Sequence, residues 1–172
     1  MSGEGSNRVS DPAEEQKAAP PGPPPLRPFG LVLHHNGAWS HEGGGILNDK
    51  LRRHFDRSVR YLPEEGKFVV RLGRFRGQIE VEEAGFFVRE FDAVTGQIRL
   101  SDRSFEALKV ETLHLSSRDG ALLCRVKEGL EPAGLLARFT HSSHSDLMNS
   151  LEDTASGPVL RIGGVAIPLP DL

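Results

Sequence analysis

Hydrophobic and polar residues alternate in the same way over two segments of the chain. The segment "SVRYLPEEGKFVVRL" covers residues 58–72, and "TLHLSSRDGALLCRV" covers residues 112–126, which is 54 positions later (112 − 58). In each segment the apolar side chains recur every second residue, which places them on one face of a β-strand. Loops that end in glycine, "PEEG" and "SRDG", separate the strands and favour β-hairpins. The pattern therefore predicts two related hairpins.

The two hairpins are expected to pack together through their apolar faces. Val70 and Cys124 occupy the same position of the two segments, so we interpret Cys124 as a buried packing residue and not as a reactive thiol. A repeated unit of this size cannot bury its apolar face alone, whereas two copies can bury each other's. We therefore predict an internal repeat, with two related motifs at about residues 45–91 and 99–145.

Helical spacing of apolar residues occurs in three places. A short N-terminal helix is predicted upstream of the first hairpin, where an asparagine can cap the helix and apolar residues follow at helical intervals: Leu47, Leu51 and Phe55. The second motif has Phe105 and Leu108 at such a spacing, for barely two turns. A longer C-terminal helix is predicted over residues 133–151. "THSSHS" in its middle has poor helix propensity and is expected to break it.

The remaining segments read as antiparallel hairpins. "LVLHHNGAWSH" turns at Asn36-Gly37, the strongest short hairpin signal, and "PVLRIGGVAIPL" turns at Gly163-Gly164. Between them, "GQIEVEEAGFFVREF" contains two strands interrupted near Ala84-Gly85. The predicted fold class is α+β, made mostly of antiparallel β-hairpins with the repeated motif and the two helices described above.

The first 28 residues differ in composition from the rest. They contain 7 of the 12 prolines and only Val9 and Leu26 as sizeable aliphatic side chains. Such a segment cannot bury enough apolar surface to offset the entropy of ordering, so we predict a disordered Pro-rich tail. Residues 29–172 are then one α+β domain, long enough to bury a single core.

Charge and cysteine content narrow the functional classes. A net charge of −3 argues against nucleic-acid binding through bulk electrostatics. One cysteine excludes an intrachain disulfide and a cysteine-based zinc site. No apolar run reaches membrane-spanning length, and the chain begins without an apolar segment after a basic patch. We expect a cytoplasmic protein without nucleic-acid or membrane partners and without a cofactor. Its oligomeric state stays open.

Five stretches, taken in order, carry a resemblance to a known family: "GAWSHEG" (37–43), "GKFVVR" (66–71), "IEVEEAGFFV" (79–88), "LLARF" (135–139) and "GGVAIPL" (163–169). Together they resemble the bacterial domain-of-unknown-function family DUF1285, over about residues 31–169. The resemblance is thin between residues 96 and 132. It implies a small α+β fold with an internally repeated motif and a role in binding or signal transduction, and it brings no catalytic residues with it.

A basic segment is the strongest candidate for a binding site. Residues 50–76 contain nine Lys and Arg against three acidic residues. Arg74 and Arg76 flank Phe75, and Arg71 lies on the adjoining strand, so their guanidinium groups are suited to a carboxylate or phosphate. With Trp39 as an aromatic anchor, the candidate ligand-binding residues are Trp39, Arg71, Arg74 and Arg76. No catalytic or metal-binding residues are assigned.

Each part of this candidate site has an alternative. The arginines can instead form a cross-strand charge ladder with acidic residues of the next strands, and we favour this interpretation. The acidic residues are Glu80, Glu82, Glu83 and Glu90. For Trp39, packing in the core is the commoner outcome. The sequence does not decide between a site and a ladder.

The leading functional hypothesis is a non-enzymatic binding or signalling module that recognises a small anionic molecule or a protein partner. The alternative is a metal-dependent hydrolase, because His141 and His144 are spaced so that a helix would place them on one face, as metal ligands require. No third ligand motif of the HExxH kind accompanies them. No GxSxG elbow and no Walker loop are found either.

Overall fold

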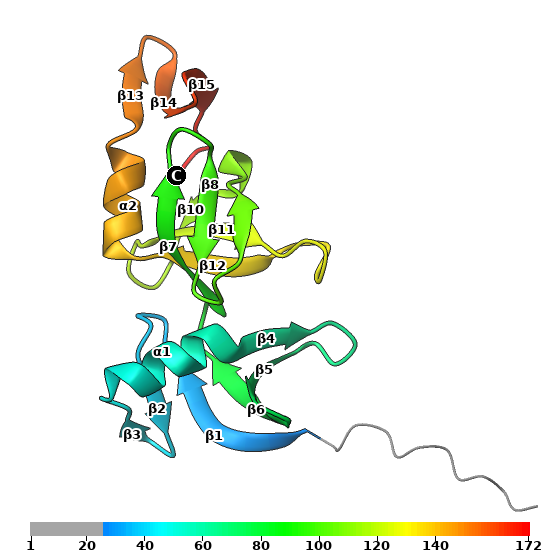
Figure 1. Cartoon of the computed structure of the whole chain (residues 1–172). Helices are drawn as coiled ribbons and strands as arrows, with labels where there is room; N and C mark the ends of the chain where they lie inside the picture. The colour runs from blue at the N-terminus through cyan, green and yellow to red at the C-terminus, as the bar shows by residue number, and fades with distance from the viewer. Residues whose placement is uncertain (1–25) are drawn as a thin grey trace, which may run out of the picture.

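The computed structural model describes residues 26–172. These residues form two six-stranded sheets, a three-stranded sheet and two α-helices (Figure 1), so the predicted α+β class is confirmed. Most of the predicted Pro-rich tail, residues 1–25, lies outside the described residues. Strand β1 already begins at Arg27, so Arg27 and Pro28 belong to the first sheet and not to the predicted tail.

The first sheet has a parallel pair at its centre. Its strand order is β3-β2-β1-β6-β5-β4, and all neighbours are antiparallel except β1 and β6. The strands are β1 (Arg27–Leu33), β2 (Trp39–His41), β3 (Gly44–Gly45), β4 (Val59–Leu62), β5 (Lys67–Leu72) and β6 (Phe75–Val81). Helix α1 (Asp49–Ser58) connects β3 to β4, and Figure 1 shows it on the side of this sheet that faces the second sheet.

The second sheet has the same strand order as the first, with each number raised by six. Its order is β10-β11-β12-β7-β8-β9, and its parallel pair is β7 and β12. The strands are β7 (Phe86–Asp92), β8 (Gln97–Leu100), β9 (Phe105–Ala107), β10 (His114–Leu115), β11 (Leu122–Val126) and β12 (Leu135–Phe139). A 3₁₀ turn, η1 (Val110–Thr112), takes the place that α1 has in the first sheet.

The two predicted hairpins are present, and their pairing registers correspond. Tyr61 pairs with Phe68 in β4–β5, and Leu115 pairs with Leu122 in β10–β11, again 54 positions later (115 − 61). Val70 and Cys124 are both fully buried and belong to the same hydrophobic cluster. Burial raises the pKa of the Cys124 thiol to about 12, as expected for a packing residue.

Helix α1 is amphipathic. It begins after Asn48, whose side-chain oxygen accepts a hydrogen bond from the Leu51 amide at 3.0 Å, and its first turn carries Asp49 where a negative charge favours the helix dipole. Phe55 faces the sheet and is buried, whereas the opposite face of the helix is rich in arginine. The extended conformation of Val59 ends the helix and leads into β4.

The prediction of one helix over residues 133–151 is wrong in its first part. Residues 135–139 form strand β12, in which Leu135, Ala137 and Phe139 are buried at alternate positions. Helix α2 (His141–Met148) is shorter and begins within "THSSHS", where a break was expected. Thr140 caps it, and the buried Ser143 hydroxyl donates to the Val88 carbonyl at 2.7 Å. Residues with poor helix propensity thus begin a helix here, because their side chains form hydrogen bonds with the backbone.

The second predicted helical segment of the repeat is also absent, because Phe105 lies in β9. The three-stranded sheet contains β13 (Leu151–Thr154), β14 (Gly157–Ile162) and β15 (Val165–Pro168), and its second hairpin turns at the predicted Gly163-Gly164. Among the described residues, neither helix has the length and apolar character needed to cross a membrane.

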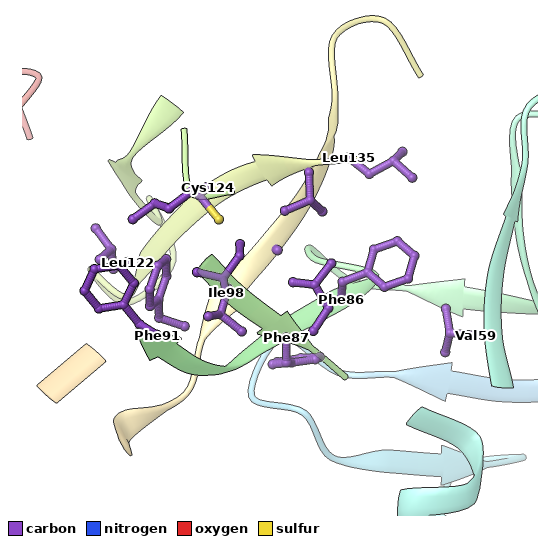
Figure 2. Close-up of a cluster of buried hydrophobic side chains, with 14 of the residues drawn as sticks. Val59, Phe86, Phe87, Phe91, Ile98, Leu122, Cys124 and Leu135 are labelled. Carbon is purple, nitrogen blue, oxygen red and sulfur yellow. The ribbon is translucent and has the colours of Figure 1, made fainter. Parts of the chain in front are cut away.

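One hydrophobic cluster connects the two large sheets. Figure 2 shows Val59 of β4 near Phe86 of β7. Buried side chains of the second sheet lie beside them, among them Ile98 and Cys124. The Phe86 ring also meets the Phe68 ring of β5 edge-on, with 6.1 Å between ring centroids. The packing of the two sheets against each other therefore positions the surfaces on both sides of their junction.

Candidate functional site

Trp39 does not lie at a surface. Its side chain is 1% exposed, its ring packs 5.3 Å from the Phe55 ring, and its indole N–H donates to Asp56 Oδ1 at 2.9 Å. Of the two sequence interpretations, the structure therefore supports core packing for Trp39, and the residue cannot anchor a ligand directly.

The three predicted arginines lie on the β5–β6 hairpin, apart from Trp39. Arg71 and Arg76 are cross-strand neighbours, and the Arg74 guanidinium carbon lies 5.2 Å from the centre of the Phe75 ring. Arg76 Nη2 lies 4.0 Å from Glu65 Oε1. Trp39, Arg71, Arg74 and Arg76 are therefore not brought together into one pocket.

The acidic residues of the predicted charge ladder pair with residues outside the β5–β6 hairpin. Glu82 binds His34 and His35, Glu83 binds Arg138, and Glu90 binds Arg99. These partners come from β8, from β12 and from the residues that follow β1, all of them distant in the sequence from the β5–β6 hairpin or on another strand pair. Three of the four acidic residues expected to pair do so, but with other partners than predicted: Glu82, Glu83 and Glu90.

A cleft lies elsewhere, at the junction of the two large sheets. It has a volume of about 760 Å³ and is bordered by α1, by β7 and β8, by the turn between β8 and β9, and by the first residues of α2. Six arginines line it, against two aspartates: Arg52, Arg53, Arg57, Arg89, Arg99 and Arg103, with Asp49 and Asp56. We call it the arginine cleft.

Helix α1 supplies the first wall of the arginine cleft. Arg52 pairs with Asp49 one turn earlier, and this hydrogen bond lowers the pKa of the Asp49 carboxyl. Arg53 and Arg57 have no carboxylate within 4.0 Å among residues 26–172. Like charges four residues apart weaken a helix by about 0.2–0.5 kcal/mol. The helix therefore keeps an unfavourable pair of arginines facing the cleft.

Asp56 connects the arginine cleft to the core. Its Oδ1 accepts the buried Trp39 indole N–H, and its Oδ2 accepts a hydrogen bond from Arg89 Nη2 at 2.7 Å. Arg89 also lies over the Phe87 ring, 5.7 Å from its centre. The Asp56 side chain is 12% exposed and the Arg89 side chain 39% exposed. The environment of the only tryptophan is thus coupled to the floor of the cleft.

The second wall comes from β8 and the turn that follows it. Arg99 pairs with Glu90 on β7 through both carboxylate oxygens, which lowers the pKa of Glu90 through the hydrogen bonds. Arg103 follows in the turn and, within the described part of the chain, has no carboxylate within 4.0 Å. Asp102 holds this turn, because it accepts hydrogen bonds from Ser104 and pairs with Lys127 at 2.9 Å.

The start of α2 completes the border of the cleft with Thr140, His141 and Ser142. The first amides of a helix have no acceptor within the helix, and they add positive potential at this end. A cleft with this charge and these donors can bind phosphate or carboxylate groups, which arginine recognises with two parallel hydrogen bonds.

The two histidines of the hydrolase hypothesis border different pockets. His141 borders the arginine cleft, whereas His144 lines a separate apolar pocket of about 180 Å³ together with Leu147 and Met148. Among residues 26–172, no group of three or more His, Cys, Asp or Glu side chains is arranged to hold a metal ion.

A second polar cluster lies where β1 and β6 end. Glu82 Oε1 is 2.7 Å from His34 Nδ1, and His34 Nε2 is 2.8 Å from Ser40 Oγ. Glu82 Oε2 contacts His35 Nδ1 at 2.9 Å, and hydrogen bonds from His35, then His34, lower the Glu82 pKa to about 2. The order Ser–His–Glu is that of a hydrolase triad. Ser40 is only 7% exposed and lines none of the pockets described above, so its hydroxyl is not accessible to a substrate.

None of the four predicted site residues lines the arginine cleft. The basic run over residues 50–76 does include three of its arginines, Arg52, Arg53 and Arg57, but the predicted site lay at the end of this run. The spacing of Arg53 and Arg57 on the polar face of a predicted helix was the available signal. The sequence around Arg89, Arg99 and Arg103 has no such pattern. These residues border the cleft only because the two sheets pack against each other.

The fold and the cleft together define an α+β protein with an arginine-lined cleft. Its fold is that of a DUF1285 family protein from Silicibacter pomeroyi DSS-3, with a TM-score of 0.58 and 19% identity over 85% of this chain and 82% of that chain. A DUF1285 family protein from Shewanella baltica OS155 matches with a TM-score of 0.48 and 12% identity, over 71% of this chain and 91% of that chain. The resemblance to this family is thus confirmed at the level of the fold.

Comparison with protein-family models and with curated proteins finds no match.

Proposed function

We propose that this protein is a binding module that recognises a small anionic ligand in the arginine cleft. The main observation in support is that six arginines line one cleft, three from α1 and three from β7, β8 and the turn after β8. Three of the six have no carboxylate within 4.0 Å in the described part of the chain: Arg53, Arg57 and Arg103. Gathering like charges costs free energy, which a bound anion offsets. Ligand recognition without catalysis fits the binding or signalling role that the family resemblance implies.

The volume of the cleft favours a small molecule over a protein partner. Sites for cofactors and drug-sized ligands measure about 300–1,000 Å³, and the arginine cleft falls within this range. A protein partner would instead need a large complementary surface with an apolar centre. The arginine cleft has no large apolar residue on its border other than Leu100.

Thermal unfolding in the presence of phosphate compounds tests the proposal. Inorganic phosphate, a nucleoside monophosphate and a nucleoside diphosphate should each raise the melting temperature above that in chloride of equal ionic strength, because a ligand that binds only the folded state stabilises it. Replacing Arg53 and Arg57 together by glutamine should abolish this response. The double variant Arg71→Gln, Arg74→Gln removes the same charge outside the cleft and should leave the response unchanged.

The two double variants also define the result that contradicts the proposal. If no phosphate compound stabilises the wild-type protein, or if both double variants lose the response equally, the cleft is not the binding site. Trp39 fluorescence gives a second readout, since the Asp56 carboxylate joins its indole to Arg89 in the cleft.

The metal-dependent hydrolase is the weaker proposal. Its supporting feature is the spacing of His141 and His144, whereas the two side chains border different pockets. Metal analysis of the purified protein decides it, because a hydrolase of this kind requires a stoichiometric metal ion.

We also infer that the two large sheets are copies of one structural unit. The identical strand orders and the shared register of the two hairpins support this inference. An experimental structure in which His114 is not paired with Leu123, the counterpart of Arg60 with Val69, would contradict it.

A further inference from the structure

The arginines without a carboxylate partner fall into two sets on different walls of the cleft. Arg53 and Arg57 come from α1, which covers the first sheet. Arg103 comes from the turn after β8, in the second sheet, where Arg99 and Arg89 lie on neighbouring strands. The positive charge of the cleft is therefore supplied from both sides of the junction between the two sheets.

The set on α1 is suited to one phosphate group. Residues four apart on a helix have their Cβ atoms about 5–6 Å from each other, so the Arg53 and Arg57 guanidinium groups can both reach the same tetrahedral anion. Arg52 already pairs with Asp49, so the guanidinium groups of Arg53 and Arg57 are the two on α1 that can bind a ligand.

The set on the second sheet is suited to another anionic group. Arg103 is exposed and is carried on a turn that Asp102, Ser104 and Lys127 hold in place. Arg99 and Arg89 add charge, although each already binds one carboxylate. A single phosphate on α1 would leave the charge of Arg103 uncompensated.

Apart from the arginines and the two aspartates, the cleft is lined mostly by small or uncharged residues. Gly37, Leu100, Ser101 and Ser142 are among them, and Gly37 presents no side chain. A volume of about 760 Å³ is far more than one phosphate fills, and it falls in the range of drug-sized ligands, about 300–1,000 Å³. The remaining room is suited to an organic body such as a nucleoside.

We propose that the arginine cleft recognises a ligand with two phosphate groups separated by an organic body, as in a nucleoside bisphosphate. One phosphate binds Arg53 and Arg57 of α1, and the other binds Arg103 beside β8. This inference rests on the proposed function, since it names the class of anion for the same cleft.

Calorimetric titration with three adenosine nucleotides tests the inference. The probes are the monophosphate, the diphosphate with adjacent phosphates, and a bisphosphate with one phosphate on each of two ribose oxygens. The last two carry the same number of phosphate groups and differ in how these are spaced. The bisphosphate should bind at least about tenfold more tightly than either of the others, which corresponds to one additional charge-assisted contact.

Variants assign the two phosphates. Arg103→Asn removes the charge and keeps a residue that tolerates the left-handed backbone found there, φ 72°. It should reduce the bisphosphate affinity to that of the monophosphate and leave the monophosphate affinity within about threefold, since no contact to that ligand is lost. Arg53→Gln with Arg57→Gln should weaken both ligands. Arg71→Gln should change neither, and circular dichroism checks that each variant is folded.

The outcomes separate the two proposals. Equal affinity for the diphosphate and the bisphosphate, with loss in the α1 variant, overturns the two-position inference and leaves anion binding in place. Loss of bisphosphate preference in Arg71→Gln but not in Arg103→Asn also overturns it. Absence of binding by all three nucleotides overturns this inference and the proposed function together.

Discussion

Replacing Asp56 tests how the cleft is joined to the core. The Asp56 carboxylate is the acceptor for the Trp39 indole N–H at 2.9 Å and for Arg89 at 2.7 Å. Asp56→Ala removes both acceptors, whereas Asp56→Asn keeps an oxygen for the indole and removes the charge. Comparison of the two variants therefore separates the buried hydrogen bond from the ion pair.

The magnitudes follow from the burial of each partner. Trp39 is 1% exposed, so leaving its N–H without an acceptor costs about 1–3 kcal/mol. The Arg89 side chain is 39% exposed, so its ion pair contributes at most about 1 kcal/mol. Alanine has a higher helix propensity than aspartate, so the substitution also adds up to about 0.7 kcal/mol to the free energy of unfolding. We expect Asp56→Ala to lower the free energy of unfolding by about 1–3 kcal/mol, and Asp56→Asn by about 1 kcal/mol or less.

Urea denaturation followed by far-ultraviolet circular dichroism measures these differences. Trp39→Phe removes the donor, so the penalty of Asp56→Ala should shrink by about 1 kcal/mol or more in the Trp39→Phe background. The reasoning fails if Asp56→Ala lies within about 0.5 kcal/mol of wild type. It also fails if Asp56→Asn is as destabilising as Asp56→Ala, or if the double-mutant cycle shows no coupling.

Two further predictions concern the junction of the sheets and the acidic cluster. Gly85→Ala would place a Cβ atom 2.2 Å from Phe68 Cε1 and should lower the free energy of unfolding by about 1–3 kcal/mol in urea denaturation. Hydrogen bonds from His35 and His34 lower the pKa of Glu82 from its ordinary value of 4.5 to about 2. Its stabilising contribution is therefore present above pH 4.5 and is lost as the pH falls toward 2, so stability should fall less steeply over this range in Glu82→Gln.

Each of these predictions has a matched control. Gly45→Ala introduces the same methyl group where nothing lies within 4 Å, so a loss equal to that of Gly85→Ala would show that crowding by Phe68 is not the cause. For Glu82→Gln the control is Glu80→Gln, which removes a carboxylate two residues earlier, on β6. Acid unfolding curves that coincide for wild type and Glu82→Gln would contradict the assigned pH dependence.

The hairpins were predictable because their signals are local. Val59 pairs with Val70 and Leu115 with Leu122 as alternation and glycine-containing loops indicate. The hairpin at Asn36-Gly37 also forms, with Leu33 paired to Trp39. In each case the turn residues and the apolar face lie within about fifteen positions of one another, so few alternatives compete.

The segment at residues 135–139 was not predictable in the same way. "LLARF" has apolar residues at spacings that fit a strand and the start of a helix equally well. The structure forms a strand because β7 on one side and β11 on the other complete its backbone hydrogen bonds. A short apolar run takes the conformation that its neighbours can pair with, and those neighbours are distant in the sequence.

The sequence alone determined the local units of this protein: hairpins with one apolar face, a capped amphipathic helix and a basic segment, all set by side chains within a few residues of each other. Only the tertiary structure decided where charge accumulates. Arg57 and Arg103 share a cleft because the two sheets pack through Phe68 and Phe86, and no spacing along the chain encodes that meeting. Hydrophobic burial is not directional, so it fixes which faces meet only once whole sheets exist.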